Sequence, residues 1–346
     1  MKILVTGGAG YIGSHTAVAL HQAGHTPIIL DDFRNSSPSA IEGIAKIIEE
    51  QPILHTGDCT DAEFVQSVFS THQIDGVIHF VGLKSVGESV QKPLDYYRNN
   101  VDSLLTVLEA MQKFQTPRLI FSSSATVYGE ADACPITEEA PTKKSASPYG
   151  NTKQICEDII ADTVASRAFP LQAIALRYFN PIGAHPSGYI GELPIGTPNN
   201  LVPYLTQAAA KKRGQLTVFG NDYPTPDGTG VRDFIHVMDL AEAHLSALDY
   251  LAKKEDLSSR YEIFNVGTGR GTSVLELIDT FEKINGVPVP HTFGPRRPGD
   301  IATCFADARK IEQTIGWQAK RPISEALKDA WNWEQRNNAM QNEYPI

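Results

Sequence analysis

The sequence predicts a doubly wound α/β fold, in which helices cover both faces of a parallel sheet, with a smaller C-terminal α/β lobe. Three observations lead to this prediction. Short apolar runs alternate with helix-length stretches in the first half, a glycine-rich turn follows the first run, and Pro and Gly become frequent after Asn180. Short apolar runs separated by helical spacing are typical of strands buried on both faces of a parallel sheet. Such strands need crossover helices, which the intervening stretches are long enough to form.

Six apolar runs are expected to form strands, at residues 3–5, 28–30, 53–55, 77–80, 119–121 and 174–176. A segment with helical periodicity follows the first run and extends to Leu20. Because this strand–turn–helix order opens the chain and then repeats, the sequence predicts a Rossmann-type doubly wound sheet.

The second half of the chain has a different composition. Residues 181–230 are rich in Pro and Gly, which predicts loops with one short helix over about residues 202–213. Two later helices are expected to start at capping boxes, formed by Asp239 with Glu242 and by Ser273 with Glu276.

These patterns predict two domains, over residues 1–180 and 181–346, and leave open whether segments near 232–266 return to the first. We expect the second domain to lie over the carboxyl edge of the sheet, where doubly wound folds bind their ligands.

Charge and composition argue against several classes of protein. The formal net charge of −10 argues against a surface for nucleic acid or an anionic membrane. No stretch approaches the ~20 apolar residues needed to cross a bilayer, and the N-terminus lacks the apolar region of a signal peptide. The four cysteines are widely spaced without a C-x-x-C pair, and no H-E-x-x-H motif is present. We therefore expect a protein of the reducing cytoplasm, and we assign no metal.

The turn after the first run carries Gly7, Gly10 and Gly13 directly before a helix. Gly7 permits the tight turn, Gly10 lets a pyrophosphate approach the N–H groups of the helix N-terminus, and Gly13 lets helix and strand pack closely. The second strand ends at Asp31, eighteen residues after Gly13, where a ribose-binding acid is expected. This context indicates a dinucleotide site.

The acidic residues after the second and third strands bear on which dinucleotide binds. Asp31 and Asp32 could end a strand in solvent, but we favour a carboxylate that accepts the adenosine ribose hydroxyls. Arg34 would suit the 2′-phosphate of NADP, whereas Asp31 would repel it, so NAD is expected. Asp58 is expected beside the adenine, with a helix N-cap as its alternative role.

The segment from Ser147 to Lys153 carries the most specific chemistry. Pro148 favours the first turn of a helix, so Tyr149 and Lys153, spaced i and i+4, project from one face. A free phenol has a pKa near ~10 and is a poor base at neutral pH. The Lys153 ammonium and an oxidised nicotinamide are expected to favour the phenolate and so to lower the pKa of Tyr149.

A serine run follows the fifth predicted strand, which places its hydroxyls at the carboxyl edge of the sheet. Ser124 is expected to hold the reacting hydroxyl of a substrate against Tyr149. A serine run or a Y-x-x-x-K pair alone is more often structural than catalytic. Found together on a dinucleotide-binding sheet, Ser124, Tyr149 and Lys153 indicate a catalytic group.

With these motifs the chain resembles the extended short-chain dehydrogenase/reductase family and, within it, the UDP-sugar 4-epimerases. The resemblance covers nearly the whole chain and includes residues 79–89, 177–181, 198–201, 219–223, 228–237 and 296–300. These later segments are more diagnostic than the glycine turn.

The resemblance implies a cofactor site and a substrate site. Cofactor contacts are expected from Gly7, Gly10, Tyr11, Ile12, Gly13, Asp31, Asn35, Asp58, Cys59, Phe80, Val81, Gly82, Lys84, Asn99, Ser122, Tyr149, Lys153 and Tyr178. Contacts with a UDP-hexose are expected from Ser124, Tyr149, Asn180, Asn200, Leu201, Phe219, Arg232, Arg297, Asp300 and Cys304. Arginine suits a diphosphate because its planar fork offers paired donors, although surface ion pairs with Asp233 or Asp300 are the alternative.

The implied activity is that of an NAD-dependent isomerase, which interconverts UDP-glucose and UDP-galactose through a transient 4-keto sugar and bound NADH. Cys304 stands where some relatives carry a bulky aromatic residue, which predicts that UDP-GalNAc and UDP-GlcNAc are also epimerised. Its alternative role is that of a small core residue.

Two other functions stay open at this point. An NDP-sugar 4,6-dehydratase of the same fold would need carboxylates where this chain has Ala125 and Thr126. A noncatalytic NAD-sensing protein would need neither the catalytic group nor the UDP-binding loops. The resemblance also implies a homodimer, with helices around residues 95–113 and 150–166 as interface candidates.

Overall fold

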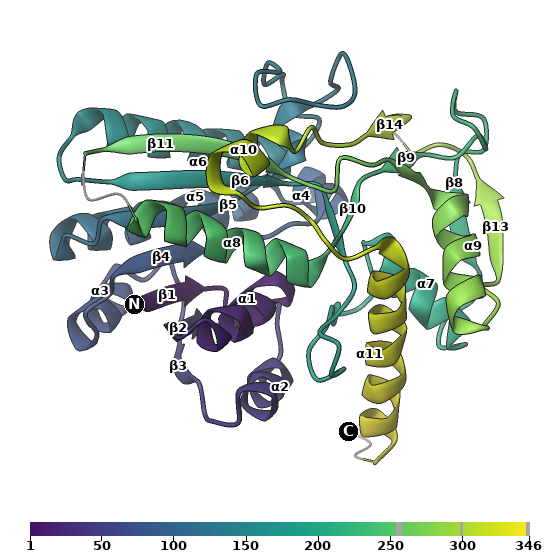
Figure 1. The fold of residues 1–346 in the computed structure, drawn as a ribbon, viewed down its shortest axis with the longest axis horizontal. Coiled ribbons are helices and arrows are strands. Elements are labelled where there is room, and N and C mark those ends of the chain that lie inside the picture. The colour runs from purple at the N-terminus through teal and green to yellow at the C-terminus, as the bar shows by residue number, and fades with distance from the viewer. Residues whose placement is uncertain (254–257, 298–299, 344–346) are drawn as a thin grey trace.

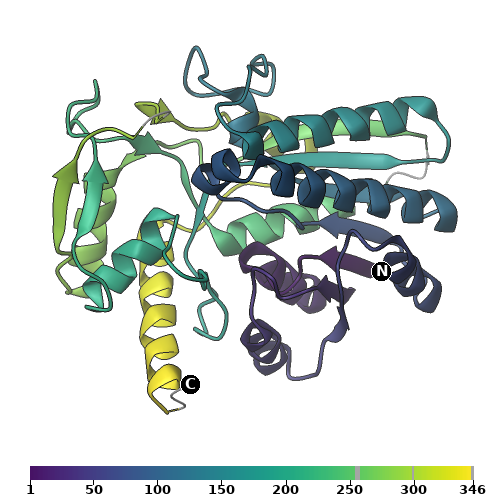
Figure 2. The ribbon, with the colours of Figure 1, turned by 180° about the vertical axis from the view of Figure 1, so that it is seen from behind.

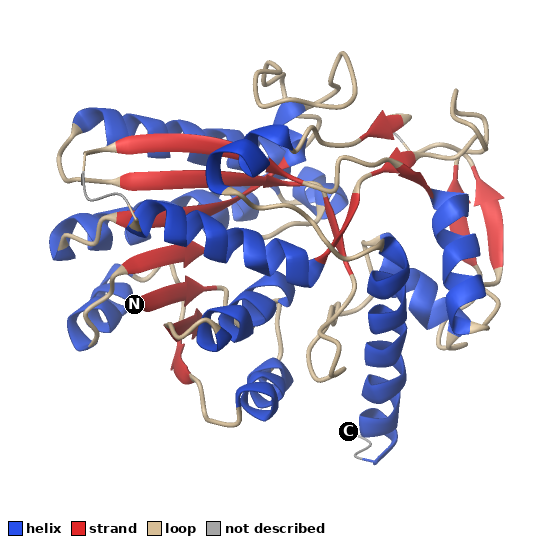
Figure 3. Cartoon of the chain, in the orientation of Figure 1, coloured by secondary structure: helices blue, strands red, loops and turns tan. Residues whose placement is uncertain are grey.

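The computed structural model describes residues 1–253, 258–297 and 300–343. Its centre is a parallel sheet (Figures 1 and 3), which confirms the predicted fold class. Seven strands lie in the order β11-β6-β5-β4-β1-β2-β3. Their bounds are Lys2–Thr6 for β1, Thr26–Asp31 for β2, Ile53–Thr56 for β3, Gly76–His79 for β4, Arg118–Ser124 for β5, Gln172–Tyr178 for β6 and Arg260–Val266 for β11.

All six predicted strands form, and β11 is the one strand of the seven-stranded sheet that was not predicted. It pairs in parallel with β6 at the edge of the sheet. Its first four residues are only partly buried, and Arg260 and Glu262 interrupt its apolar pattern. An edge strand needs no continuous apolar run, so this strand gave no clear signal.

Helices cover both faces of the sheet because successive strand side chains point to opposite faces. Leu4 packs into one apolar cluster, whereas Ile3 and Val5 pack into another. One face carries α1 (Tyr11–Gln22), α2 (Pro38–Ile48), α8 (Val237–Ala252) and α10 (Arg309–Ile315), and Figure 1 shows α1, α8 and α10 in front of the strands. The other face, in front in Figure 2, carries α3 (Ala62–Thr71), α5 (Pro93–Phe114) and α6 (Pro148–Ser166).

A second group of elements stands beside the carboxyl ends of the strands (Figure 1). Its core is an apolar cluster between α7 (Leu201–Ala209), α9 (Val274–Asn285), α11 (Ile323–Glu343) and the parallel pair of β8 (Leu216–Phe219) with β13 (His291–Gly294).

Short strands link this group to the large sheet. They are β7 (Asn180–Ile182), which pairs with β10 (Phe234–His236), and β9 (Val231–Arg232), which lies between β12 (Thr272–Ser273) and β14 (Thr303–Cys304). Two further short helices, α4 (Val86–Gln91) and the 3-10 helix η1 (Ala125–Tyr128), follow β4 and β5.

Three predictions in this half need correction. Residues 181–230, expected to be loops with one short helix, also contain the strand β8, which pairs with β13. The helix expected over 202–213 ends at Ala209, and Lys211 adopts a positive φ of 59° that a helix cannot continue. The capping box at Asp239 is wrong, since α8 begins two residues earlier and the His236 ring caps it by accepting the N–H of Met238. Asp239 instead accepts hydrogen bonds from Arg321.

The Ser273 cap is confirmed, because its hydroxyl accepts the N–H of Glu276 at 3.0 Å at the start of α9. None of the helices in the described part of the chain combines the length and the apolar character that crossing a bilayer requires.

Candidate active site

The glycine turn has the close backbone contacts that its sequence predicts. Gly7 adopts a φ of +72°, and its N–H donates to Leu30 of β2 at 2.7 Å. A Cβ on Gly13 would lie 2.3 Å from the Gly7 carbonyl oxygen, so the first turn of α1 packs directly on the turn before it. Gly10 is the N-cap residue of α1 and offers no side chain, which leaves the N–H groups of the helix N-terminus approachable.

Asp31 is a buried carboxylate rather than a solvated strand end. Its Oδ2 accepts the N–H of Ala9 at 2.9 Å, and its Oδ1 accepts the Phe33 N–H at 3.0 Å and the Ser36 hydroxyl at 2.7 Å. The side chain therefore ties the glycine turn to the end of β2. Oδ1 already accepts two hydrogen bonds, whereas Oδ2 accepts one and keeps a lone pair for a ligand hydroxyl, so the ribose role stays a prediction.

Arg34 is engaged by carboxylates of the chain itself. Its Nη2 lies 2.7 Å from Asp58 and 3.0 Å from Asp32. Burial would raise the pKa of Asp58, but hydrogen bonds from Thr60 and Arg34 lower it overall. Because the charge of Arg34 is matched by two acids, this end of the groove suits ribose hydroxyls better than a 2′-phosphate.

The N-cap role considered for Asp58 is wrong, since Asp61 caps α3 by accepting the N–H groups of Glu63 and Phe64.

A groove runs along the carboxyl ends of β1, β2 and β4. Ten of the predicted cofactor residues line it: Gly7, Gly10, Asp31, Asn35, Asp58, Cys59, Phe80, Val81, Gly82 and Asn99. Leu30, Asp32, Arg34, Ser36, Gly57 and Leu83 complete its lining.

The groove fits an extended dinucleotide such as NAD. A Cβ on Gly7 would lie 3.0 Å from the backbone nitrogen of Val81, so only glycine leaves space where the two loops meet. At one end Asp31 and Asp58 offer carboxylates for hydroxyl and amino groups. At the other, a Cβ on Gly82 would lie 3.6 Å from Lys153 Nζ, which brings the groove beside the predicted catalytic group.

The catalytic prediction depends on where α6 begins, and it begins at Pro148. Ser147 caps the helix by accepting the Gly150 N–H at 3.2 Å, so Tyr149 and Lys153 lie one turn apart. The Lys153 ammonium donates to the carbonyl of Ser122 at 2.7 Å, at the end of β5. The hydroxyl of Ser124, two residues further on, lies near Tyr149 and acts to lower the pKa of the phenol. The fold thus brings all three predicted catalytic side chains together.

The protonation of this group differs from the expectation. Burial raises the pKa of Tyr149, and only the nearby hydroxyl of Ser124 opposes that shift. Burial also lowers the pKa of Lys153 to about 8, against the opposing influence of Cys156 and Glu157. In the chain by itself desolvation therefore raises the pKa of Tyr149, and the expected lowering by Lys153 together with an oxidised nicotinamide stays a prediction.

The other predicted cofactor residues surround these elements. The Tyr11 hydroxyl donates to the Gly183 carbonyl at 2.7 Å, and Ile12 packs against the core. Lys84 lies over the Tyr11 ring, 6.0 Å from its centroid. The Tyr178 hydroxyl makes a short hydrogen bond with the buried ring of His244.

Two buried polar groups behind the site were missed by sequence reasoning. The Asn100 amide accepts the Leu83 N–H at 2.7 Å and donates to Thr152 at 3.0 Å, which joins the groove to α6. Glu157 accepts the Ser123 hydroxyl at 2.5 Å and forms a two-point ion pair with Arg177, at 3.0 and 2.6 Å. No local motif marks either group, because their partners are distant in sequence.

The predicted substrate residues lie on the loops and short strands between the two groups of elements. Asn180 opens β7, Asn200 precedes α7, Leu201 packs on the core of the second group, and Cys304 ends β14 beside Arg232 of β9. Phe219, at the end of β8, is 38% exposed, and the Arg297 guanidinium lies 4.7 Å from its ring centroid.

Arg232 and Arg297 both pair with Asp300, at 4.0 and 3.0 Å. Ion pairs with Asp300, considered as the alternative for these arginines, are therefore present, and their diphosphate role stays a prediction. Asp233 is not their partner, because it is buried and accepts the N–H groups of Thr268, Gly269 and Ala306. Residues 298–299 of the predicted segment 296–300 lie outside the described residues.

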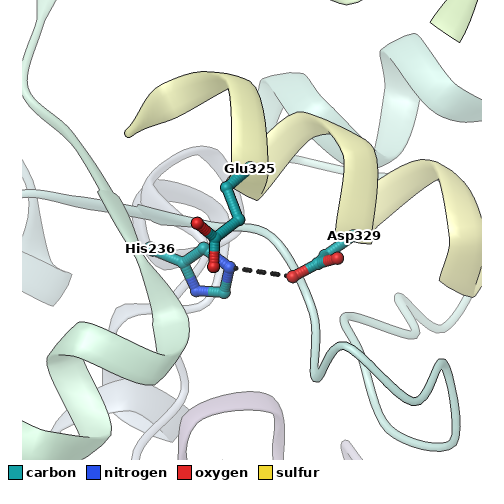
Figure 4. A group of neighbouring side chains, drawn as sticks. All are labelled: His236, Glu325 and Asp329. Carbon is teal, nitrogen blue, oxygen red and sulfur yellow. Dashed lines mark hydrogen bonds and ion pairs between the residues drawn. The ribbon is translucent and has the colours of Figure 1, made fainter. Parts of the chain in front are cut away.

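One group of described residues has the composition of a metal site: His236, Glu325 and Asp329 (Figure 4). The Nδ1 atom of His236 accepts the Met238 N–H at 3.0 Å, so in the neutral ring the proton resides on Nε2. That nitrogen lies 3.2 Å from Asp329 of α11, as the dashed line in Figure 4 marks. A nitrogen that carries a proton has no lone pair for a metal, so this contact serves as a hydrogen bond between the two groups of elements.

The family follows from comparison with known proteins. The family model described as GDP-mannose 4,6 dehydratase matches residues 4–330. A protein of Yersinia enterocolitica named UDP-glucose 4-epimerase is 51% identical over 97% of this chain and 98% of its own length. The chain belongs to the UDP-glucose 4-epimerase family.

Solved structures of UDP-glucose 4-epimerases have the same fold. The enzyme from Stenotrophomonas maltophila, with bound NAD and formylated UDP-arabinopyranose, matches with a TM-score of 0.94 and 47% identity, over 98% of this chain and 99% of that chain. The enzyme from Bifidobacterium longum, in complex with NAD+ and UDP, matches with a TM-score of 0.92 and 46% identity over the same shares. The predicted resemblance to the UDP-sugar 4-epimerases is thereby confirmed.

Proposed function

We propose that this protein is a UDP-glucose 4-epimerase that uses NAD to interconvert UDP-galactose and UDP-glucose. The proposal depends on one observation: Ser124, Tyr149 and Lys153 lie together at the carboxyl end of β5, beside the groove that the glycine turn lines. Relatives of this name match nearly the whole chain, and structural neighbours are described with NAD and UDP ligands. A dehydratase is disfavoured, because η1 follows Ser124 with Ala125 and Thr126 and offers no carboxylate there.

The residues of the groove would hold NAD, with the glycine turn at its pyrophosphate and Asp31 at its adenosine ribose. When bound, NAD supplies the hydride acceptor, then the hydride donor, and a positive charge on its oxidised ring. Lys153, which donates to the end of β5, adds a second positive charge on the same side. These charges oppose the effect of burial and favour the Tyr149 phenolate.

Tyr149 would take the proton from the 4-hydroxyl of the hexose and return it to the same oxygen after the sugar has turned, so that the opposite face of C4 is then reduced. Ser124 would hold that hydroxyl close to the phenol, since its own hydroxyl lies near Tyr149 at the end of β5. Between the two steps the 4-keto sugar turns about its bonds to the diphosphate. Arg232 and Arg297, paired with Asp300, stand where they can exchange that carboxylate for phosphate oxygens.

The test is to incubate the purified protein with UDP-galactose, without added NAD, and to follow UDP-glucose by ion-pair chromatography. Product should approach equilibrium without net release of NADH, since the reaction is redox-neutral. A folded protein that forms no product even with added NAD would refute the activity and favour the noncatalytic NAD-sensing alternative.

Replacing Tyr149 by Phe tests the assigned base. General acid–base catalysis contributes about 10²–10⁴-fold, so turnover should fall by at least about 100-fold. Folding and NAD content should be kept, because the change removes one oxygen atom and leaves the glycine turn, Asp31 and Lys153 in place. Turnover within about threefold of the parent protein would rule Tyr149 out as the base.

We further propose that UDP-GalNAc and UDP-GlcNAc are substrates, because Cys304 leaves a small side chain beside Arg232 on the substrate side. Its replacement by Tyr should abolish turnover of UDP-GalNAc while turnover of UDP-galactose stays within about threefold. Inert UDP-GalNAc with the parent protein, or equal effects of the substitution on both sugars, would count against this proposal.

The proposed assembly is a homodimer through α5 and α6, which pack together on one face of the sheet. Apolar side chains near this face are solvent-exposed, among them Val86, Val90, Leu94 and Leu105. Light scattering after size-exclusion chromatography should give twice the chain mass, and Leu105→Glu should shift that mass toward the monomer. A monomeric parent protein would refute the dimer.

We also propose a role in galactose metabolism. We propose a cytoplasmic location, since all four cysteines are unpaired.

A further inference from the structure

Glu192 lies in the loop between β7 and α7 and contacts two residues that the proposed function assigns to different ligands. Its Oε1 accepts a hydrogen bond from Lys84 Nζ at 3.1 Å and another from the Asn200 amide at 2.5 Å. Lys84 belongs to the loop after β4, at the groove for NAD. Asn200 immediately precedes α7, on the side expected to hold UDP. One carboxylate therefore joins the two binding regions.

The backbone of Glu192 is anchored from behind. A Cβ on Gly191 would lie 2.4 Å from the Trp333 ring, so the missing side chain lets the indole pack flat against the loop. The Trp333 N–H donates to the Glu192 carbonyl at 3.1 Å. Trp333 belongs to α11 and is 8% exposed. The loop thus holds the carboxylate at a fixed place relative to α11.

The Lys84 side chain is more exposed to solvent than that of Glu192. The Glu192 side chain is 11% exposed, whereas that of Lys84 is 51% exposed. A long exposed lysine loses rotamer entropy when it is held in one position, and a buried carboxylate at 3.1 Å offsets that loss. The negative charge of Glu192 would repel a diphosphate on either side. Glu192 is therefore better suited to orient the donors of Lys84 and Asn200 than to contact a diphosphate itself.

We propose that Glu192 is a positioning residue, which holds Lys84 toward the pyrophosphate of NAD and Asn200 toward the diphosphate of UDP-hexose, and so couples the binding of the two. This inference rests on the proposed function. Binding of UDP fixes Asn200 and with it Glu192 and Lys84, so UDP slows the loss of NAD. By linkage, NAD also strengthens UDP binding.

The test compares Glu192→Ala and Glu192→Gln with the NAD-loaded parent protein. Glu276→Gln serves as the matched control, because Glu276 pairs with Arg270 on an exposed surface of α9. Calorimetry gives the Kd of UDP, and the release of NAD into an excess of apo-dehydrogenase gives its dissociation rate with and without saturating UDP. Steady-state kinetics with UDP-galactose separates KM from kcat.

With Glu192→Ala we expect the Kd of UDP and the KM to rise about tenfold, the loss of one charged hydrogen-bonding group, while kcat stays within about threefold. UDP should no longer slow NAD release. Glu192→Gln keeps an acceptor oxygen in the same place and should restore the Kd to within about threefold. Unchanged UDP binding and NAD release with Glu192→Ala, or a fall in kcat at constant KM, would overturn the proposal.

A second background separates coupling from a general structural effect. In Lys84→Met, the further change of Glu192 to Ala should leave NAD release unchanged, because the link to the cofactor side is already broken. Additive effects of the two substitutions would overturn the coupling. A parent protein that binds neither NAD nor UDP would refute the proposed function itself, which distinguishes that failure from a failure of Glu192 alone.

Discussion

Replacing Glu157 by Gln tests the buried ion pair behind the catalytic group. Glu157 and Arg177 are 5% and 3% exposed, and their two contacts measure 3.0 and 2.6 Å. The substitution keeps the volume but leaves the Arg177 guanidinium buried without a counter-charge. Removing one partner of a buried pair costs about 3–5 kcal/mol of unfolding free energy.

This cost can be converted into a melting temperature. With an unfolding entropy of about 2.1 cal/mol/K per residue over 346 residues, the melting temperature should fall by roughly 4–7 °C. Scanning calorimetry and urea unfolding measure the two quantities. The control is Glu276→Gln, which breaks an exposed pair at 3.0 Å and should cost less than about 1 kcal/mol.

The same substitution should change the pH dependence of activity. The Glu157 carboxylate favours the charged form of Lys153, whose pKa burial lowers to about 8. Without that carboxylate the pKa of Lys153 falls further, so activity should be lost at lower pH on the alkaline side. The double variant Glu157→Gln, Arg177→Met should regain most of the stability, since no unpaired charge is left. A loss below about 1 kcal/mol in the single variant would refute this reasoning.

Two further predictions concern the glycine turn and the buried histidines. Gly13→Ala should lose bound NAD, because the new Cβ would lie 2.3 Å from the Gly7 carbonyl oxygen. The NAD content is measured from the absorbance of the purified protein. The control Gly214→Ala has open space around the new Cβ and should keep NAD, and equal NAD content in the two variants would contradict the packing argument. Burial lowers the pKa of His79 to about 3 and that of His244 to about 4. Below pH ~6.5 the unfolded chain therefore binds protons that the folded chain does not, and stability present above that pH falls by up to about 1.4 kcal/mol per pH unit for each histidine. Urea unfolding between pH 7.5 and 5 should show a shallower decline in His79→Asn, and an identical slope would argue against this source of acid sensitivity.

The sequence by itself determined most of the sheet and the residues that meet at the candidate site. Five of the six predicted strands were predictable because strands buried on both faces need continuous apolar runs, as at Ile28 to Leu30. The sixth, β3, lies at the other edge of the sheet and is only partly buried, but its apolar pair Ile53 and Leu54 still marked it. The glycine turn and the Tyr149–Lys153 pair were predictable because their function requires fixed local spacings. The edge strand β11 was not, since its partial exposure tolerates Arg260 and Glu262.

Only the tertiary structure decided which distant residues form ion pairs and hydrogen bonds with one another. No sequence pattern places Glu192 between Lys84 and Asn200, or Glu157 against Arg177, because each contact joins segments whose approach depends on the packing of whole elements. The same holds for the pKa of Tyr149, which burial raises although a lysine stands one turn away. Local spacing fixes which groups can face one ligand, whereas desolvation and long-range partners are properties of the folded surroundings alone.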